Sequence, residues 1–253
     1  MLVFATQLQE FNVQATNGEL GKVKDIYFDK ENWTARYLVI DTRKWLPGKR
    51  VLLSPVTFDH VDFENKTVNI LETKENIKDS PVVEEDEPIS RRKEAILNTY
   101  FAWPHYWNHH DTTNHGAFPT PEELKHAART EPNLTPEQEE SRMLASVNEM
   151  KGDLTGFKVK TSDGKLGKVT NFIIDDNNWK LQYFVVDTKP MLHGKFTALS
   201  VDWMEEISWE EKEVIIDLPK DLVENGPFFE FNTPFTREDE RRLHESYNKT
   251  PYF

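Results

Sequence analysis

Short stretches of alternating apolar and polar residues recur along the first third of the chain. The segment FNVQAT at 11–16 alternates and then meets Asn17-Gly18, a dipeptide typical of two-residue hairpin turns because Gly adopts positive φ without strain. Further stretches rich in β-branched and aromatic residues, separated by turn residues, lie at 22–29, 36–41, 50–55, 58–64 and 67–72. This spacing predicts the strands of a small closed β-barrel or sandwich.

The same pattern occurs twice. An offset of 146 residues aligns 17–70 with 163–216 without a gap, and 21 of these 54 positions are identical. Such self-similarity is the signature of a tandem duplication. The offset continues more weakly downstream through the pairs Pro81/Pro227, Pro88/Pro234, Arg91/Arg237, Glu94/Glu240, Leu97/Leu243 and Tyr106/Tyr252.

Within each repeat, two residue types indicate special backbone positions. Gly21 and Gly167 fall inside strand patterns, where Gly marks a bulge or a tight corner. Trp33 and Trp179 occupy turns between strands, and we expect them to cap one end of each barrel.

Each repeat ends in a tail with a helical pattern. Ser90 and Thr236 stand at expected N-caps, and Ile96, Leu97 and Tyr100 give the first tail an apolar stripe. In the linker between the repeats, capping boxes at 120–123 and 135–138 predict two further helix starts.

The fold prediction is therefore mainly β: two tandem small barrels related by a pseudo-two-fold, each followed by a short helical tail, with a helical linker between them. The predicted boundaries are 1–79 for the first barrel, 80–147 for its tail and the linker, 148–224 for the second barrel and 225–253 for the C-terminal tail.

Both copies resemble the PRC-barrel domain. The resemblance rests on NGELGKV with NWTARYLVIDT in the first copy, and on DGKLGKV with NWKLQYFVVDT in the second. This domain forms the cytoplasmic part of the H subunit of the photosynthetic reaction centre and the C-terminal half of the ribosome maturation factor. The layout resembles bacterial proteins with two PRC-barrels and no assigned activity. The resemblance implies a six-stranded barrel that serves as an interaction module.

Composition narrows the class of protein. The chain has 253 residues, of which 37% are hydrophobic and 30% charged, and its net charge is −13. This charge argues against nucleic-acid binding and against anionic lipid. The absence of Cys excludes disulfides and thiolate chemistry. The first residues lack signal-peptide features and no apolar run is long enough to cross a membrane, so we expect a cytoplasmic protein.

Sequence motifs for catalysis are absent. The chain contains no GxGxxG, GxxxxGK[ST], GxSxG or HExxH, and no cofactor is expected. We therefore expect a protein that is not an enzyme. One cluster of candidate metal ligands, HYWNHHDTTNH, supplies His105, His109, His110, Asp111 and His115. Imidazole with carboxylate suits zinc, nickel or copper, so a metal-dependent or small-ligand-dependent enzyme or a stress sensor is an alternative.

The favoured interpretation is a non-enzymatic adaptor that binds a protein partner, with homodimerisation left open. An assembly factor associated with ribosomes or a membrane complex is a further alternative, suggested by the resemblance alone. Aromatic residues at the ends of the tails and in one basic turn are the candidate partner-binding residues. They are Trp45, Trp103, Tyr106, Trp107, Tyr252 and Phe253.

Overall fold

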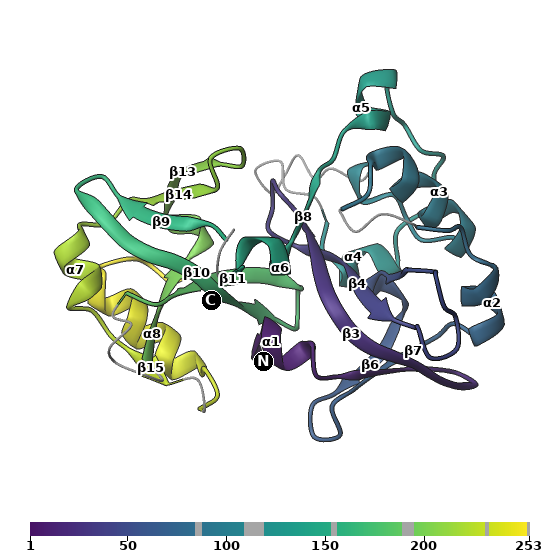
Figure 1. The fold of residues 1–253 in the computed structure, drawn as a ribbon, viewed down its shortest axis with the longest axis horizontal. Helices are drawn as coiled ribbons and strands as arrows, with labels where there is room; N and C mark the ends of the chain where they lie inside the picture. The colour runs from purple at the N-terminus through teal and green to yellow at the C-terminus, as the bar shows by residue number, and fades with distance from the viewer. Residues whose placement is uncertain (84–87, 109–118, 153–155, 189–194, 231–232, 252–253) are drawn as a thin grey trace. The chain divides into compact units, whose positions relative to one another are not determined.

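The structure, a computed structural model, describes the chain except residues 84–87, 109–118, 153–155, 189–194, 231–232 and 252–253 (Figure 1). Its contacts divide the chain into two compact units, each built around one repeat. The first-repeat unit comprises Gln7–Ser146 with Asn177–Lys180, and the second-repeat unit comprises Met1–Thr6, Val147–Asp176 and Leu181–Phe253.

The first-repeat unit is built on a sheet with strand order β5-β4-β3-β2-β7-β6, to which β8 adds beside β3. Its strands are β2 (Asn12–Ala15), β3 (Gly18–Asp29), β4 (Ala35–Asp41), β5 (Val51–Leu53), β6 (Phe58–Asp62), β7 (Thr67–Ile70) and β8 (Leu144–Ser146). Pairing is antiparallel except between β2 and β7, which run parallel. The mainly β prediction is confirmed for this repeat.

The second-repeat unit repeats this arrangement in the order β13-β14-β9-β10-β11-β12-β15, with β1 beside β10. Its strands are β1 (Leu2–Phe4), β9 (Lys158–Thr161), β10 (Gly164–Asp175), β11 (Lys180–Val186), β12 (Lys195–Ser200), β13 (Met204–Ser208), β14 (Glu213–Ile216) and β15 (Phe229–Glu230). The parallel pair recurs between β9 and β14, at the positions equivalent to β2 and β7.

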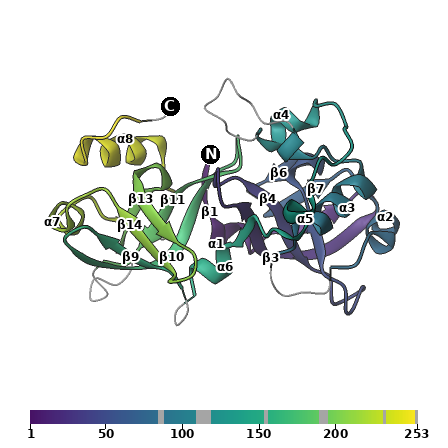
Figure 2. The same ribbon diagram turned by 90° about the horizontal axis from the view of Figure 1, so that it is seen from above.

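Most helices are short, and the two longest are the predicted tails. They are α1 (Ala5–Leu8), α2 (Lys74–Asp79), α3 (Arg91–Phe101), α4 (Pro121–Lys125), α5 (Pro136–Glu140), α6 (Val147–Met150), α7 (Lys220–Glu224) and α8 (Arg237–Ser246), with 3₁₀ turns η1 (Pro55–Thr57), η2 (Tyr106–Asn108) and η3 (Val201–Trp203). The views in Figures 1 and 2 show α3 and α8 each beside the strands of its own repeat. Within the described residues, no helix combines the length and apolar character that a membrane crossing needs.

The helix starts follow from capping. Thr120 and Thr135 form the predicted capping boxes, and Thr236 forms a third at the start of α8. Ser90 lies at the N-cap of α3, although its side chain makes no capping hydrogen bond.

The two units do not follow the linear boundaries expected from the sequence. β1, at the start of the chain, pairs with β10 through Leu2 opposite Asp175, and β8, which precedes the second repeat, pairs with β3 through Leu144 opposite Asp29. Each unit therefore receives one short strand from the segment that precedes the other repeat. Unpaired strand edges can accept such additions because their N–H and C=O groups lack partners.

The repeated glycines lie at irregularities in the strand pairing, as predicted. Gly21 has φ of +148°, and a Cβ there would lie 1.9 Å from the carbonyl oxygen of Asp41. A Cβ on Gly167 would lie 2.4 Å from the carbonyl oxygen of Asp187. The register shifts beside both positions. Any side chain here would push the neighbouring strand away, so only Gly fits.

Trp33 and Trp179 adopt left-handed backbone conformations in their turns, with φ of 56° and 60°. Both side chains are buried. Trp33 stacks on Phe28, with ring centroids 5.1 Å apart. Trp179 lies in the turn that belongs to the first-repeat unit and meets the edge of Phe58 at 5.2 Å.

Candidate functional site

A buried polar cluster joins α3 to the first barrel. Arg91, Glu94 and Asn98 lie three and four residues apart and therefore share one face of the helix. Glu94 is 0% exposed, with Nη1 of Arg91 3.2 Å from its Oε1. The hydroxyl of Tyr106 donates to Oε2 of Glu94 over 3.0 Å, and the hydroxyl of Tyr37 on β4 donates to Oδ1 of Asn98 over 2.8 Å. The cluster thus fixes the tail helix on its own barrel.

Burial sets the protonation chemistry of this cluster. It raises the pKa of Glu94 to about 7, although the charge of Arg91 and the hydrogen bond from Tyr106 act in the opposite direction. The guanidinium of Arg36 lies over the ring of Tyr106, 4.1 Å from its centroid, and its Nε donates to Asp29 over 2.7 Å. The charged side chains of this cluster, Asp29, Arg36, Arg91 and Glu94, are all buried.

The second-repeat unit carries an equivalent cluster at the same offset. Arg237 bonds both Glu240 and Asp175, each over 2.6 Å. The hydroxyl oxygen of Tyr183 lies 2.9 Å from Oε1 of Glu240 and 2.9 Å from Nε2 of His244. His244 stands where the first repeat has Asn98. The repeated pairs Arg91/Arg237 and Glu94/Glu240 were the sequence signal for these clusters.

The second cluster differs from the first in containing a histidine, His244, whose contacts indicate which ring nitrogen carries the proton. Nδ1 of His244 lies 3.1 Å from the backbone carbonyl of Thr250, which can only accept, so Nδ1 carries a proton. A neutral ring then offers Nε2 as an acceptor, and the single proton of Tyr183 can serve either Nε2 or Glu240. Burial lowers the pKa of His244, while the Thr250 contact and the charge of Glu240 raise it less.

We expect His244→Asn to make the second-repeat unit less sensitive to acid. Because the pKa of folded His244 lies below its ordinary 6.5, its contribution to stability is complete above that value and is lost as the pH falls. Asn can still accept from Tyr183, as Asn98 does from Tyr37. Urea unfolding at about pH 7.5 and about pH 5 measures the effect.

The matched control for this substitution is His126→Asn, at an exposed position after α4. It should leave the loss of stability between the two pH values as in the wild type. An equal loss in wild type and His244→Asn would contradict the prediction.

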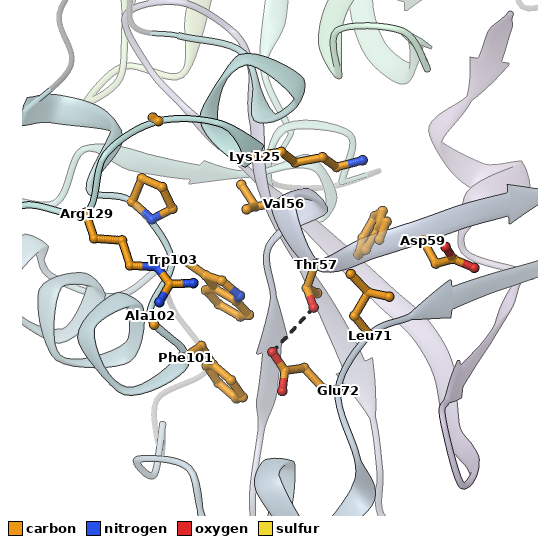
Figure 3. Close-up of a pocket in the computed structure, with 13 residues that line it drawn as sticks. Val56, Thr57, Asp59, Leu71, Glu72, Phe101, Ala102, Trp103, Lys125 and Arg129 are labelled. Atoms are coloured by element: carbon orange, nitrogen blue, oxygen red, sulfur yellow. Dashed lines mark hydrogen bonds between the residues drawn. The ribbon is translucent and has the colours of Figure 1, made fainter.

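Beside the first cluster, the surface has a hollow of about 410 Å³ (Figure 3). It is bounded by the start of β6, the end of β7, the C-terminal end of α3 and the segment around α4. The lining residues are Val56, Thr57, Phe58, Asp59, Leu71, Glu72, Phe101, Ala102, Trp103, Pro104, Lys125, Ala127 and Arg129. This volume falls in the range of about 300–1,000 Å³ typical of binding pockets.

One wall of the hollow is aromatic and another is polar. Phe101 and Trp103 stack with centroids 4.4 Å apart and planes 12° apart. Opposite them, the hydroxyl of Thr57 donates to Glu72 over 3.5 Å, the contact drawn as a dashed line in Figure 3. The side-chain amide of Asn76 donates to the other carboxylate oxygen over 2.5 Å. The polar wall is therefore already hydrogen-bonded.

Several residues that line the hollow differ between the repeats. The position of Thr57 is held in the second repeat by Trp203, whose ring lies 5.0 Å from that of His244 and 5.4 Å from that of Tyr247. The second repeat therefore has a large indole packed against its tail helix where the first repeat has the much smaller threonine. At the positions of Leu71 and Trp103, the second repeat has Asp217 and Lys249, which form an ion pair over 3.3 Å.

Comparison with known proteins identifies the scaffold. The profile of the PRC-barrel domain matches residues 1–77 and 151–223. The chain belongs to the PRC-barrel family. No curated protein matches the chain. The PRC-barrel matches end before α3 and α8, so the aromatic wall of the hollow and the α4 segment lie outside the matched PRC-barrel regions.

Of the candidate metal ligands, the structure describes His105 alone. It is buried beside Trp107, with ring centroids 5.0 Å apart. His109, His110, Asp111 and His115 lie outside the described residues. Among the residues that the structure does describe, no three His, Asp or Glu side chains gather as metal ligands would.

Of the candidate partner-binding aromatics that the structure describes, two are buried and two are half-buried. Trp103 and Tyr106 are buried at the end of the α3 tail, which docks on the PRC-barrel of its own unit. Trp107 is half-buried and lies under Arg91 at 4.4 Å. Trp45 is half-buried and donates its indole N–H to the carbonyl of Leu20 over 2.6 Å. Tyr252 and Phe253 lie outside the described residues.

Proposed function

We propose that this two-PRC-barrel protein is a non-catalytic interaction module, and that a partner protein docks on the α3 side of its first repeat. The contact surface, here called the α3 face, consists of Leu71, Ile96 and Tyr100 together with the hollow. These three side chains are 62%, 49% and 38% exposed. Clusters of exposed apolar residues beside a depression are typical of protein-binding surfaces.

The observation that carries the proposal is the contrast between the repeats. At the positions of Leu71, Ile96 and Tyr100, the second repeat has Asp217, Arg242 and Ser246. The scaffold beneath these positions is similar, since an arginine–glutamate pair at the same repeat positions bonds each tail helix, although Arg237 is 39% exposed where Arg91 is 5% exposed. Because apolar side chains left in water gain little from their exposure, three of them at positions that are polar in the other copy support a binding role.

The buried clusters support a structural part in this function. In the first repeat, Arg91, Glu94 and Tyr106 bond to one another beneath the helix that carries Ile96 and Tyr100, and Tyr37 on the barrel donates to Asn98 of the same helix. A helix fixed in this way presents its outer side chains in one arrangement. Preorganisation of that kind lowers the entropy lost on binding.

The test is a pull-down from lysate of the source organism, read by mass spectrometry. Wild type is compared with Leu71→Glu and Ile96→Glu, which place a charge on the α3 face, and with Leu222→Glu, which places one on an exposed leucine of the second repeat. We expect a partner recovered by wild type and Leu222→Glu to be lost from the other two variants. Equal recovery by all four proteins would contradict the assignment of the α3 face.

A further inference from the structure

We propose that the hollow of the first repeat binds a peptide segment of the partner in which an aromatic or leucine side chain lies next to a carboxylate. This inference rests on the proposed interaction function and names the chemistry of the bound segment. The apolar side chain would enter between Leu71 and the Phe101–Trp103 stack. The carboxylate would bind Arg129.

The charges around the hollow decide the sign of the ligand. Glu72 accepts hydrogen bonds from Thr57 and Asn76, and Asp59 pairs with His60 over 2.9 Å. Arg129, by contrast, is exposed and has no ion pair or hydrogen bond within the described part of the chain. Among the charged groups of the lining, Arg129 is therefore the one left to bind an anion.

Arg129 and Lys125 reach the hollow from the same segment, as Figure 3 shows. Lys125 pairs with the exposed Glu122 over 2.9 Å, a surface contact of little energy. A guanidinium binds a carboxylate through two parallel hydrogen bonds, so Arg129 favours this anion in a defined orientation. The net charge of −13 opposes an acidic ligand at long range, but physiological salt screens that repulsion beyond about 8 Å.

The apolar part of the site favours a peptide over a small molecule as the ligand. The hollow continues onto exposed Leu71 and, through the edge contact of Tyr100 with Phe101 at 4.9 Å, onto the outer side of α3. A ligand that fills only the hollow would leave this apolar surface in water. A peptide can bury both, with one anchoring side chain in the hollow.

The experiment selects phage-displayed random short peptides on the full chain and measures the affinities of the enriched peptides by fluorescence anisotropy. Thr57→Trp places in the hollow the residue that the second repeat holds at the same position. Arg129→Ala removes the unpaired cation, and Lys44→Ala removes an exposed cation elsewhere in the same unit.

We expect enriched peptides to contain Phe, Trp, Tyr or Leu beside Asp, Glu or the terminal carboxylate. Their affinity should fall at least about tenfold for Thr57→Trp and for Arg129→Ala, and should be unchanged for Lys44→Ala. Circular dichroism checks that Thr57→Trp is folded, and Arg129→Ala tests the site independently because Arg129 is exposed.

The proposal is overturned if no peptide is enriched, if enriched peptides lack acidic groups, or if Arg129→Ala binds them as wild type does. The same variants separate this proposal from the broader one. A lysate partner that depends on Leu71 and Ile96 but binds Thr57→Trp and Arg129→Ala normally would overturn the ligand chemistry and leave the interaction function standing.

Discussion

Arg91→Met is expected to destabilise the first-repeat unit by about 3–5 kcal/mol at about pH 8, the cost of leaving a buried charge without its partner. Arg91 is 5% exposed and its Nη1 lies 3.2 Å from Oε1 of Glu94, which is fully buried. The same Nη1 donates to the hydroxyl of Tyr106 over 2.5 Å. Urea unfolding of the full chain, followed by tryptophan fluorescence, measures the loss.

Two variants show whether the ion pair is the cause. Arg92→Met makes the same change at the neighbouring exposed position and should alter stability by no more than about 0.5 kcal/mol. The double variant Arg91→Met/Glu94→Leu removes both charges and should recover much of the loss. If Arg91→Met were no more costly than Arg92→Met, the cluster would not hold the tail helix as described.

The second large effect is a change in the stability of the first-repeat unit with pH. Burial raises the pKa of Glu94 from 4.5 to about 7, so the folded state binds a proton that the unfolded state has already released. The stability from this group is complete below pH 4.5 and is lost as the pH rises through about 7. At about 1.4 kcal/mol for each pKa unit, the loss is about 3 kcal/mol.

Glu94→Gln removes this titration while keeping the shape of the side chain. Wild type should therefore lose about 3 kcal/mol relative to Glu94→Gln between about pH 4.5 and about pH 8.5. Taking the difference between the two proteins cancels the titration of other groups, such as Asp41, whose pKa is lowered to about 2 by Arg43. A difference that does not change with pH would show that Glu94 keeps an ordinary pKa in the fold.

The two clusters are expected to respond to pH in opposite directions. Rising pH weakens the first-repeat unit through Glu94, and falling pH weakens the second-repeat unit through His244. The two responses come from groups at different repeated positions: Glu94 in the first copy, and in the second His244, where the first copy has Asn98, which does not titrate. The same scaffold thus carries different titrating groups.

Local patterns were enough to predict most of the secondary structure. The alternation in 11–16, the capping boxes at Thr120 and Thr135, and the glycines at 21 and 167 each act through neighbouring residues or through backbone sterics, so a single sequence shows them. The hairpin turn itself consists of Thr16 and Asn17, one residue earlier than expected, with Gly18 already in β3.

The hollow was harder to predict from the sequence, although one residue difference between the repeats points to it. Position 57 aligns with 203 at the repeat offset, and replacement of a Trp by a Thr removes a large volume. Whether that volume becomes a hollow depends on whether neighbouring groups move into it. Phe101 and Trp103 line the hollow without filling it, and Arg129 joins the lining from a segment more than 50 residues after Leu71 in the chain.

The sequence by itself determined the duplication, the PRC-barrel scaffold and the helical tails, because repeated motifs and short-range periodicity are properties of the chain. Only the tertiary structure decided that β1 joins the sheet of the second repeat and that β8 joins the sheet of the first. It also decided that burial raises the pKa of Glu94 to about 7, and that Arg129 lies beside the Phe101–Trp103 wall of the hollow. Burial and long-range contact depend on packing between segments separated by many residues, and no local pattern encodes them.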